Sequence, residues 1–197
     1  MKVPTRFSLC VYCGSRSGTR EGYLDAAREV GRQIGQRGWQ LVYGGGNVGL
    51  MGALADAALA HGARVVGVIP RTLFEREVAH RALHEQLVVD TMHQRKQAMA
   101  ERADAFLALP GGIGTLEELY EVWTWRHLGY HDQPIGLLNA GGFYDGLLAF
   151  MRHTVAEGFL SAAQFESLRA SQDAHALLDE LQALAGRAGA AEDFRRI

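Results

Sequence analysis

The chain has few cysteines and few lysines, and it has no long hydrophobic run. Of its 197 residues only Cys10 and Cys13 are cysteines, so no disulfide framework can stabilise the fold. No stretch approaches the roughly 18 uncharged apolar residues that a membrane-spanning helix requires. The short apolar run after Met1–Ser8 also lacks a signal-peptide cleavage pattern. We therefore expect a cytoplasmic protein without a membrane partner.

The chain also lacks an excess of positive charge. It has 20 Lys+Arg residues and 22 Asp+Glu residues, for a net charge of −2. This balance provides no general field that would attract nucleic acid, so we expect no nucleic-acid partner. With 48% hydrophobic residues, the composition is that of an ordinary globular protein. The length fits one domain over residues 1–185, followed by an Ala/Gly/Arg-rich tail over residues 186–197 that we expect to be disordered.

Short apolar runs alternate with segments of helical periodicity. The strand-like runs are residues 7–12, 39–43, 64–69, 86–89, 105–109 and, as the last strand, 134–138. The helical segments are residues 23–36, 50–61, 92–102, 116–128, 144–157 and 174–184. This alternation predicts an α/β fold, a Rossmann-like three-layer domain with a parallel sheet and helices on both faces. Ligands of such sheets bind at the carboxyl ends of the strands.

A first glycine loop follows the second expected strand. Residues 44–49 read Gly-Gly-Gly-Asn-Val-Gly, which satisfies the G-x-G-x-x-G pattern of dinucleotide sites. No acidic residue lies between Asp56 and Glu75, however, where such a site needs one to bind the ribose. The chain also has no Gly-Lys pair for a P-loop. We predict that Gly44, Gly45 and Gly46 form an anion-binding backbone loop, and the alternative is a tight turn without a ligand.

A second glycine loop follows the run 105–109 and reads Pro110-Gly111-Gly112-Ile113-Gly114-Thr115-Leu116-Glu117-Glu118. Thr115 and Glu118 have the spacing of a capping box, with Thr115 as the N-cap of the next helix. Capping does not require the preceding glycines, which favour free backbone amides around a phosphate, with Gly111 part of the phosphate loop. We expect Thr115 to donate its hydroxyl to that phosphate and Glu118 to face the adjoining sugar. Glu117 and Glu118 diverge by about 100° on a helix, so only one of them should face the cleft.

These motifs together resemble one family. The segments 44–52, 92–96 (Met-His-Gln-Arg-Lys) and 110–118 have the order and spacing of the Lonely guy family, over about residues 7–159. Its members are cytokinin riboside 5′-monophosphate phosphoribohydrolases, often mislabelled as lysine decarboxylases. The resemblance implies a Rossmann-like homodimer that hydrolyses the N-glycosidic bond of a nucleoside 5′-monophosphate to free base and ribose 5-phosphate. It implies no cofactor, and we expect no metal site.

The resemblance also implies roles for individual residues. The catalytic pair would be Arg95 and Glu118. The substrate-binding positions would be Glu77, Arg95, Lys96, Gly112, Ile113, Gly114, Thr115, Leu116, Glu117, Glu118 and Thr124. An ionised Glu118 can stabilise an oxocarbenium-like transition state and accept a proton from the attacking water. Arginine stays charged, so Arg95 is assigned to orientation and electrostatics. Lys96, Thr115 and the glycine amides would hold the phosphate.

Two other function classes compete with this hypothesis. Lysine decarboxylation with a pyridoxal cofactor needs a lysine for the Schiff base. The chain has only Lys2, near the terminus, and Lys96, beside the expected phosphate site, which argues against that reaction. A non-catalytic carrier of a nucleotide or of molybdenum cofactor could use similar glycine loops, but the presence of both Arg95 and Glu118 favours the enzyme. Both AMP and a prenylated adenine nucleotide fit the expected chemistry.

Two further patterns are interpreted as structural. Cys10 and Cys13 have C-x-x-C spacing, but residues three apart on a strand point to opposite faces, which does not suit a metal or redox pair. Tyr120, Trp123 and Trp125 are predicted to be core or dimer contacts rather than a platform for stacking a base.

Overall fold

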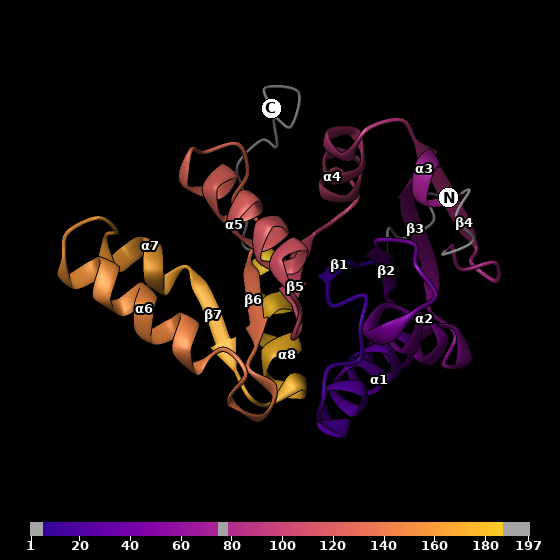
Figure 1. Cartoon of the computed structure of the whole chain (residues 1–197), viewed down its shortest axis with the longest axis horizontal. Coiled ribbons are helices and arrows are strands. Elements are labelled where there is room, and N and C mark those ends of the chain that lie inside the picture. Colours follow the sequence, from indigo (N-terminus) through magenta and orange to yellow (C-terminus); the bar gives the residue numbers. More distant parts are fainter. Residues whose placement is uncertain (1–5, 75–78, 187–197) are drawn as a thin grey trace.

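The computed structural model describes residues 6–74 and 79–186. The strands in this part of the chain are β1 (Ser8–Tyr12), β2 (Gln40–Tyr43), β3 (Arg64–Pro70), β4 (Glu85–Val89), β5 (Ala105–Ala108), β6 (Ile135–Leu138) and β7 (Leu168–Ser171). They form a seven-stranded sheet in the order β4-β3-β2-β1-β5-β6-β7 (Figure 1), and every neighbouring pair is parallel. The predicted parallel sheet is confirmed.

Helices cover both faces of the sheet. They are α1 (Glu21–Gln36), α2 (Gly49–Ala60), α3 (Arg71–Phe74), α4 (Met92–Ala100), α5 (Ile113–His127), α6 (Asp145–Ala156), α7 (Ala162–Glu166) and α8 (Ala174–Ala185), with the short 3₁₀ helix η1 (Ala140–Gly142). Helices α1, α2 and α8 pack on one face, and α4, α5 and α6 on the other (Figure 1). The predicted three-layer α/β fold is confirmed.

Alternation along β1 separates the two halves of the core. Leu9 and Val11 pack against α1, α2 and α8, whereas Cys10 and Tyr12 pack on the opposite face. Cys10 and Cys13 are both free thiols and belong to different halves of the core, as the spacing along a strand predicts. The sheet is therefore buried on both faces, which explains its nearly continuous apolar strands.

The strand order places a crevice beside β1. From β1 the chain first adds β2, β3 and β4 on one side, and then crosses to β5, β6 and β7 on the other. The loops after β1 and β5 therefore lead away in opposite directions, which is the arrangement where open α/β sheets bind ligands. The amide of Gly14 donates to the carbonyl of Pro110 over 3.1 Å, so these two loops lie side by side.

Two features of the C-terminal region were not predicted. The prediction that 134–138 is the last strand is wrong, because β7 extends the sheet beyond β6. Its sequence, Leu168-Arg169-Ala170-Ser171, has little apolar character because it is a partly exposed edge strand. The short helix α7, before β7, was also missed. The predicted disordered tail falls almost wholly on residues 187–197, outside the described part of the chain.

No helix within residues 6–74 and 79–186 has the length and apolar character of a membrane span.

Helices α1 and α2 approach each other closely at Gly31. A Cβ atom at this position would overlap the Leu54 carbonyl oxygen and would lie only 2.9 Å from the Cβ of Ala57. Real Cβ atoms do not reach such distances, so an added methyl group would push the helices apart. By contrast, a Cβ at Gly22, also on α1, would meet no atom within 4 Å.

We therefore expect Gly31→Ala to destabilise the protein by about 1–3 kcal/mol, the usual cost of overpacking. Helix propensity alone predicts the opposite, a gain of about 1 kcal/mol. The matched control Gly22→Ala should be neutral or slightly stabilising. Equilibrium urea unfolding measures both effects. Equal free energies of unfolding for the two variants would show that the contact between α1 and α2 leaves room for a methyl group at position 31.

Candidate active site

A cavity of about 620 Å³ opens at the switch point of the sheet. Residues 13–18, after β1, and residues 110–115, after β5, line it together with side chains from α1, α2, α4 and α5. The expectation that a site lies at the carboxyl ends of the strands is thus matched by a cavity of a size that suits a small organic ligand.

Helix α5 begins without a side-chain cap. Its N-cap residue is Gly112, and the first helical bond runs from the Leu116 amide to the Gly112 carbonyl over 3.1 Å. The amides at the start of a helix have no partner within the helix, so those of residues 112–115 are available to a ligand at the cavity. The positive end of the helix dipole adds to their attraction for an anion.

The predicted capping box of Thr115 and Glu118 is wrong. Thr115 is the third residue of α5 rather than its N-cap, because the helix starts at Ile113. The glycine loop permits this earlier start. A Cβ on Gly111 would overlap the Thr115 hydroxyl, so only a glycine there lets the first turn of α5 fold back against the loop. Glu118 is consequently freed from capping and is available for chemistry.

Arg95 of α4 and Glu118 of α5 form a buried ion pair at the cavity. Arg95 Nη1 donates to Glu118 Oε1 over 2.7 Å, and only 9% and 8% of the two residues is exposed. Arg95 Nε donates to the carbonyl of Val68 in β3 over 3.1 Å, which fixes the orientation of the guanidinium group. The structure therefore brings together the two residues that the family resemblance implied as a catalytic pair, although they are 23 residues apart.

Two local features place Arg95. Helix α4 begins with a capping box in which Thr91 accepts from the Gln94 amide while the Gln94 side chain accepts from the Thr91 amide. Gly44, at the end of β2, leaves space for the guanidinium group, because a Cβ there would overlap Arg95 Nη2. The first glycine loop thus has a packing role that its sequence pattern did not reveal.

Burial raises the pKa of Glu118 above its ordinary value. Removal from water disfavours the carboxylate, and this effect outweighs the attraction and the hydrogen bond of Arg95. The neighbouring Glu117 raises the pKa further, while Lys96 lowers it slightly. Such a raised pKa brings a carboxyl group closer to the range useful for proton transfer at neutral pH.

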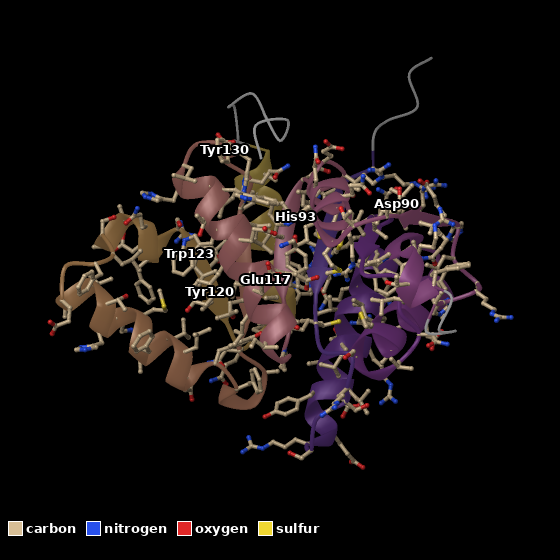
Figure 2. All side chains as sticks on the ribbon, turned by 45° about the horizontal axis from the view of Figure 1, so that its top comes forward. Asp90, His93, Glu117, Tyr120, Trp123 and Tyr130 are labelled. Carbon is tan, nitrogen blue, oxygen red and sulfur yellow. The ribbon has the colours of Figure 1, made fainter. Side chains whose placement is uncertain are left out.

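Lys96 lies next to Arg95 in the sequence but does not line the cavity. Its Nζ donates to Glu117 Oε1 over 2.6 Å and to Glu121 Oε1 over 2.8 Å. Burial opposes its charge, but the two carboxylates more than compensate and raise the pKa of Lys96. Lys96, Glu117 and Glu121 thus join α4 to α5. Figure 2 labels Glu117 on α5 and His93 on α4. The place of Lys96 between two carboxylates does not suit the predicted phosphate contact.

Several other predicted site residues lie away from the cavity. Gly45 and Gly46 do not line it; the carbonyl of Gly45 accepts from the amide of His80, and that of Gly46 accepts from the Tyr43 hydroxyl. Leu116 packs toward the core, and the exposed Thr124 donates its hydroxyl to the Tyr120 carbonyl. Glu77 lies outside the described residues. By contrast, Gly111 to Thr115 and both Glu117 and Glu118 line the cavity, so the expectation that only one of the two glutamates faces it is wrong.

The aromatic residues of α5 do not line the cavity. Tyr120 and Trp123 project toward α6 and α7 (Figure 2), where the Trp123 indole donates to Ser167 Oγ over 3.1 Å. Trp123 belongs to the core, and Trp125 packs against it, as predicted. The aromatic side chains at the cavity are instead Tyr23 of α1 and Phe143, which the sequence reasoning missed.

The loop after β1 was also missed. Its residues Gly14-Ser15-Arg16-Ser17-Gly18 line the cavity and follow the central strand directly. Small residues after the first strand of an α/β pattern, at the expected carboxyl edge, are the signal that could have identified them. Cys13, beside this loop, is not a suitable nucleophile, because burial raises the pKa of its thiol and keeps it protonated.

Several known proteins are similar to this chain in sequence. The family model described as "Possible lysine decarboxylase" matches residues 51–181. Cytokinin riboside 5′-monophosphate phosphoribohydrolase LOG1 of Arabidopsis thaliana is 46% identical over 92% of this chain and 86% of its own length. The related LOG enzyme of Oryza sativa subsp. japonica is 53% identical over 78% of this chain and 63% of its own length.

The chain belongs to the Lonely guy family. Among solved structures, the molybdenum cofactor carrier protein from Chlamydomonas reinhardtii has a TM-score of 0.70 and 22% identity, over 92% of this chain and 99% of its own. The molybdenum cofactor binding protein from Rippkaea orientalis has a TM-score of 0.71 and 18% identity, with the same coverage. At these identities the similarity shows the fold alone.

The described residues contain no group of three or more His, Cys, Asp or Glu side chains that could hold a metal ion.

The ion pair of Arg95 and Glu118 leads to a prediction that can be tested without measuring catalysis. We expect the Glu118 carboxyl to titrate above pH 4.5, the ordinary value for glutamate. Arg95→Met should raise this pKa further by removing the strongest attraction, and Lys96→Met should raise it less because Lys96 contributes less. Titration followed by ¹³C NMR of labelled glutamate measures these values, and a wild-type pKa below 4.5 would contradict the role of burial.

Proposed function

We propose that the protein hydrolyses the N-glycosidic bond of adenine-type nucleoside 5′-monophosphates, cytokinin riboside 5′-monophosphate or AMP, to the free base and ribose 5-phosphate. The observation that carries this proposal is the buried pair of Arg95 and Glu118 beside the uncapped amides of residues 112–115 in one cavity. The names of the relatives support it, since those proteins are phosphoribohydrolases of cytokinin riboside 5′-monophosphate.

The substrate phosphate binds at the start of α5. Backbone amides of residues 112–115 donate to its oxygens, and Thr115, which is buried against Gly111, adds its hydroxyl. Glu118 follows Thr115 by three residues, so it lies one helical turn further along the same side of α5. A phosphate held at the amides therefore places the attached sugar next to the Glu118 carboxylate, and binding energy becomes orientation of the scissile bond.

Glu118 and Arg95 then divide the chemistry. As the C1′–N bond breaks, its electron pair goes to the base and positive charge develops on the ribose, which the Glu118 carboxylate stabilises. The oxygen of a water molecule bonds to C1′ and Glu118 accepts the released proton. This proton then passes to the departing base, which leaves neutral, and the Glu118 carboxylate is regenerated. Arg95 stays charged, holds the carboxylate in position and provides electrostatic stabilisation.

The surroundings of Lys96 support the choice of this reaction over lysine decarboxylation, despite the description of the family model. A Schiff base requires a neutral amine, but Lys96 is charged, is held by Glu117 and Glu121, and does not line the cavity. Lys2, the other lysine, lies outside the described residues.

We also propose that the protein is a cytoplasmic homodimer. Phe150 on α6, Phe159 after it and Leu128 after α5 expose 59%, 89% and 56% of their surfaces, and a contact between two identical chains would cover such side chains. The two unpaired cysteines are consistent with a reducing compartment.

Replacing Glu118 tests the proposed reaction. We expect Glu118→Gln to lower kcat by about 10²- to 10⁴-fold, because the amide can neither accept the proton nor stabilise the ribosyl cation by charge. The exposed Glu101, at the far end of α4, provides a control for loss of one carboxylate, and Glu101→Gln should keep wild-type activity. Release of ribose 5-phosphate from AMP and from isopentenyladenosine monophosphate measures both variants.

Two results would count against this function. Release that survives Glu118→Gln would exclude the proposed role of the carboxylate. Binding of either nucleotide without release by the wild type would favour a non-catalytic carrier.

The raised pKa of Glu118 also predicts a pH dependence. The reaction needs the ionised carboxylate, so kcat/KM should fall as the pH is lowered through the pKa of Glu118 in the free enzyme. Because burial raises that pKa, the acid limb should lie above pH 4.5. A pH profile of kcat/KM measures it, and activity that remains constant down to pH 4 would contradict the assignment.

A further inference from the structure

The proposed substrate carries more negative charge than the start of α5 can balance. A phosphate monoester has a charge of about −1.5 to −2 near neutral pH. A helix N-terminus is equivalent to about half a positive charge. A further cation near the phosphate would balance more of this charge.

The two basic residues that the sequence offers nearby already have other partners. Lys96 is bound between Glu117 and Glu121 and does not line the cavity. Arg95 does line it, but its guanidinium group is bound to Glu118 and to the Val68 carbonyl. Both charges are thus largely compensated within the protein.

Arg16 is the remaining basic residue at the cavity in the described part of the chain. It is exposed and follows β1, in the loop that lies beside the glycine loop of β5. Within residues 6–74 and 79–186 its side chain forms no hydrogen bond or ion pair, unlike Arg95. Its guanidinium group is therefore available to a ligand.

The backbone that carries Arg16 is held on two sides. The Gly14 amide donates to the Pro110 carbonyl, and the Gly14 carbonyl accepts from the Leu50 amide, each over 3.1 Å. Gly49, at the start of α2, lies directly against the peptide that joins Ser15 to Arg16, where a Cβ would overlap the backbone. The loop is therefore prearranged beside residues 110–115, and only the Arg16 side chain has to be ordered on binding.

We propose that Arg16 binds the 5′-phosphate of the substrate from the loop after β1, opposite the amide donors of α5, and thereby selects phosphorylated nucleosides. This inference rests on the proposed function, because it assumes that the phosphate lies at residues 112–115. The planar, positively charged guanidinium group can donate two parallel hydrogen bonds to phosphate oxygens. The backbone amides are uncharged and cannot provide such a charge-assisted pair. The amides and Thr115 still fix the position of the phosphate without Arg16, and the phosphate does not change during the reaction, so the Arg16 contact contributes equally to binding of the substrate and of the transition state.

Steady-state kinetics with AMP and calorimetric binding of inorganic phosphate test this proposal on the full chain. Arg16→Ala should raise KM for AMP by about 10- to 100-fold and leave kcat within about 3-fold, the pattern for lost uniform binding. The Kd for inorganic phosphate should rise by a similar factor. The KM and Kd values of Arg16→Lys should lie between those of the wild type and those of Arg16→Ala, because lysine keeps the charge but cannot donate the paired hydrogen bonds.

Arg28→Ala serves as the matched control, since Arg28 is an exposed arginine of α1 that does not line the cavity. It should behave as the wild type in both measurements. Unchanged KM and phosphate affinity in Arg16→Ala would overturn the proposal, and so would a loss confined to kcat. If the wild type does not cleave AMP, the proposed function fails, and binding of inorganic phosphate alone tests the role of Arg16. Weaker phosphate binding by Arg16→Ala than by the wild type then supports that role. Equal binding by the two proteins, or no binding by the wild type, overturns it.

Discussion

The buried ion pair between Arg95 and Glu118 is the interaction on which the site depends. Two opposite charges are held almost out of water, where each would be costly without the other. The pair joins α4 to α5, so it forms only when the two halves of the sheet are assembled. Its burial has a chemical consequence, because it keeps a carboxyl group of raised pKa next to a fixed positive charge. A surface pair of the same residues would be stabilised by water and would gain little from the contact.

The fold supplies the rest of the site by topology. Strands β1 and β5 are neighbours near the centre of the sheet, and the chain continues from β1 toward β2 and from β5 toward β6, in opposite directions. The loops after β1 and β5 therefore meet at one edge. One of these loops provides uncapped amides, and the other provides Arg16, whose side chain has no partner within residues 6–74 and 79–186. Glycines make these approaches possible: Gly44 leaves room for Arg95, and Gly111 leaves room for Thr115. The amides at the start of α5 and the Arg95 side chain thus lie at one cavity before any ligand arrives.

Much of the fold could be predicted from the sequence, because strands buried on both faces are nearly continuous apolar runs. The polar edge strand β7 lacked that pattern and was missed. The positions of Arg95 and Glu118 followed from family motifs, but the partners of Lys96 did not, since contacts between α4 and α5 are set by packing. Local spacing also misplaced the start of α5, where Thr115 and Glu118 suggested a capping box that a glycine-rich entry makes unnecessary. No sequence motif indicated Arg16. Its position at the cavity follows only from the structure, where the loops after β1 and β5 lie side by side.

The most direct test of this account is a crystal structure of the Glu118→Gln variant with AMP bound. The account predicts that the phosphate accepts hydrogen bonds from the amides of residues 112–115, with C1′ of the ribose about 3.5 Å from the side chain at position 118. A nucleotide bound with its phosphate elsewhere, or with its glycosidic bond far from position 118, would contradict the central claim that α5 both holds the anion and presents the catalytic carboxylate.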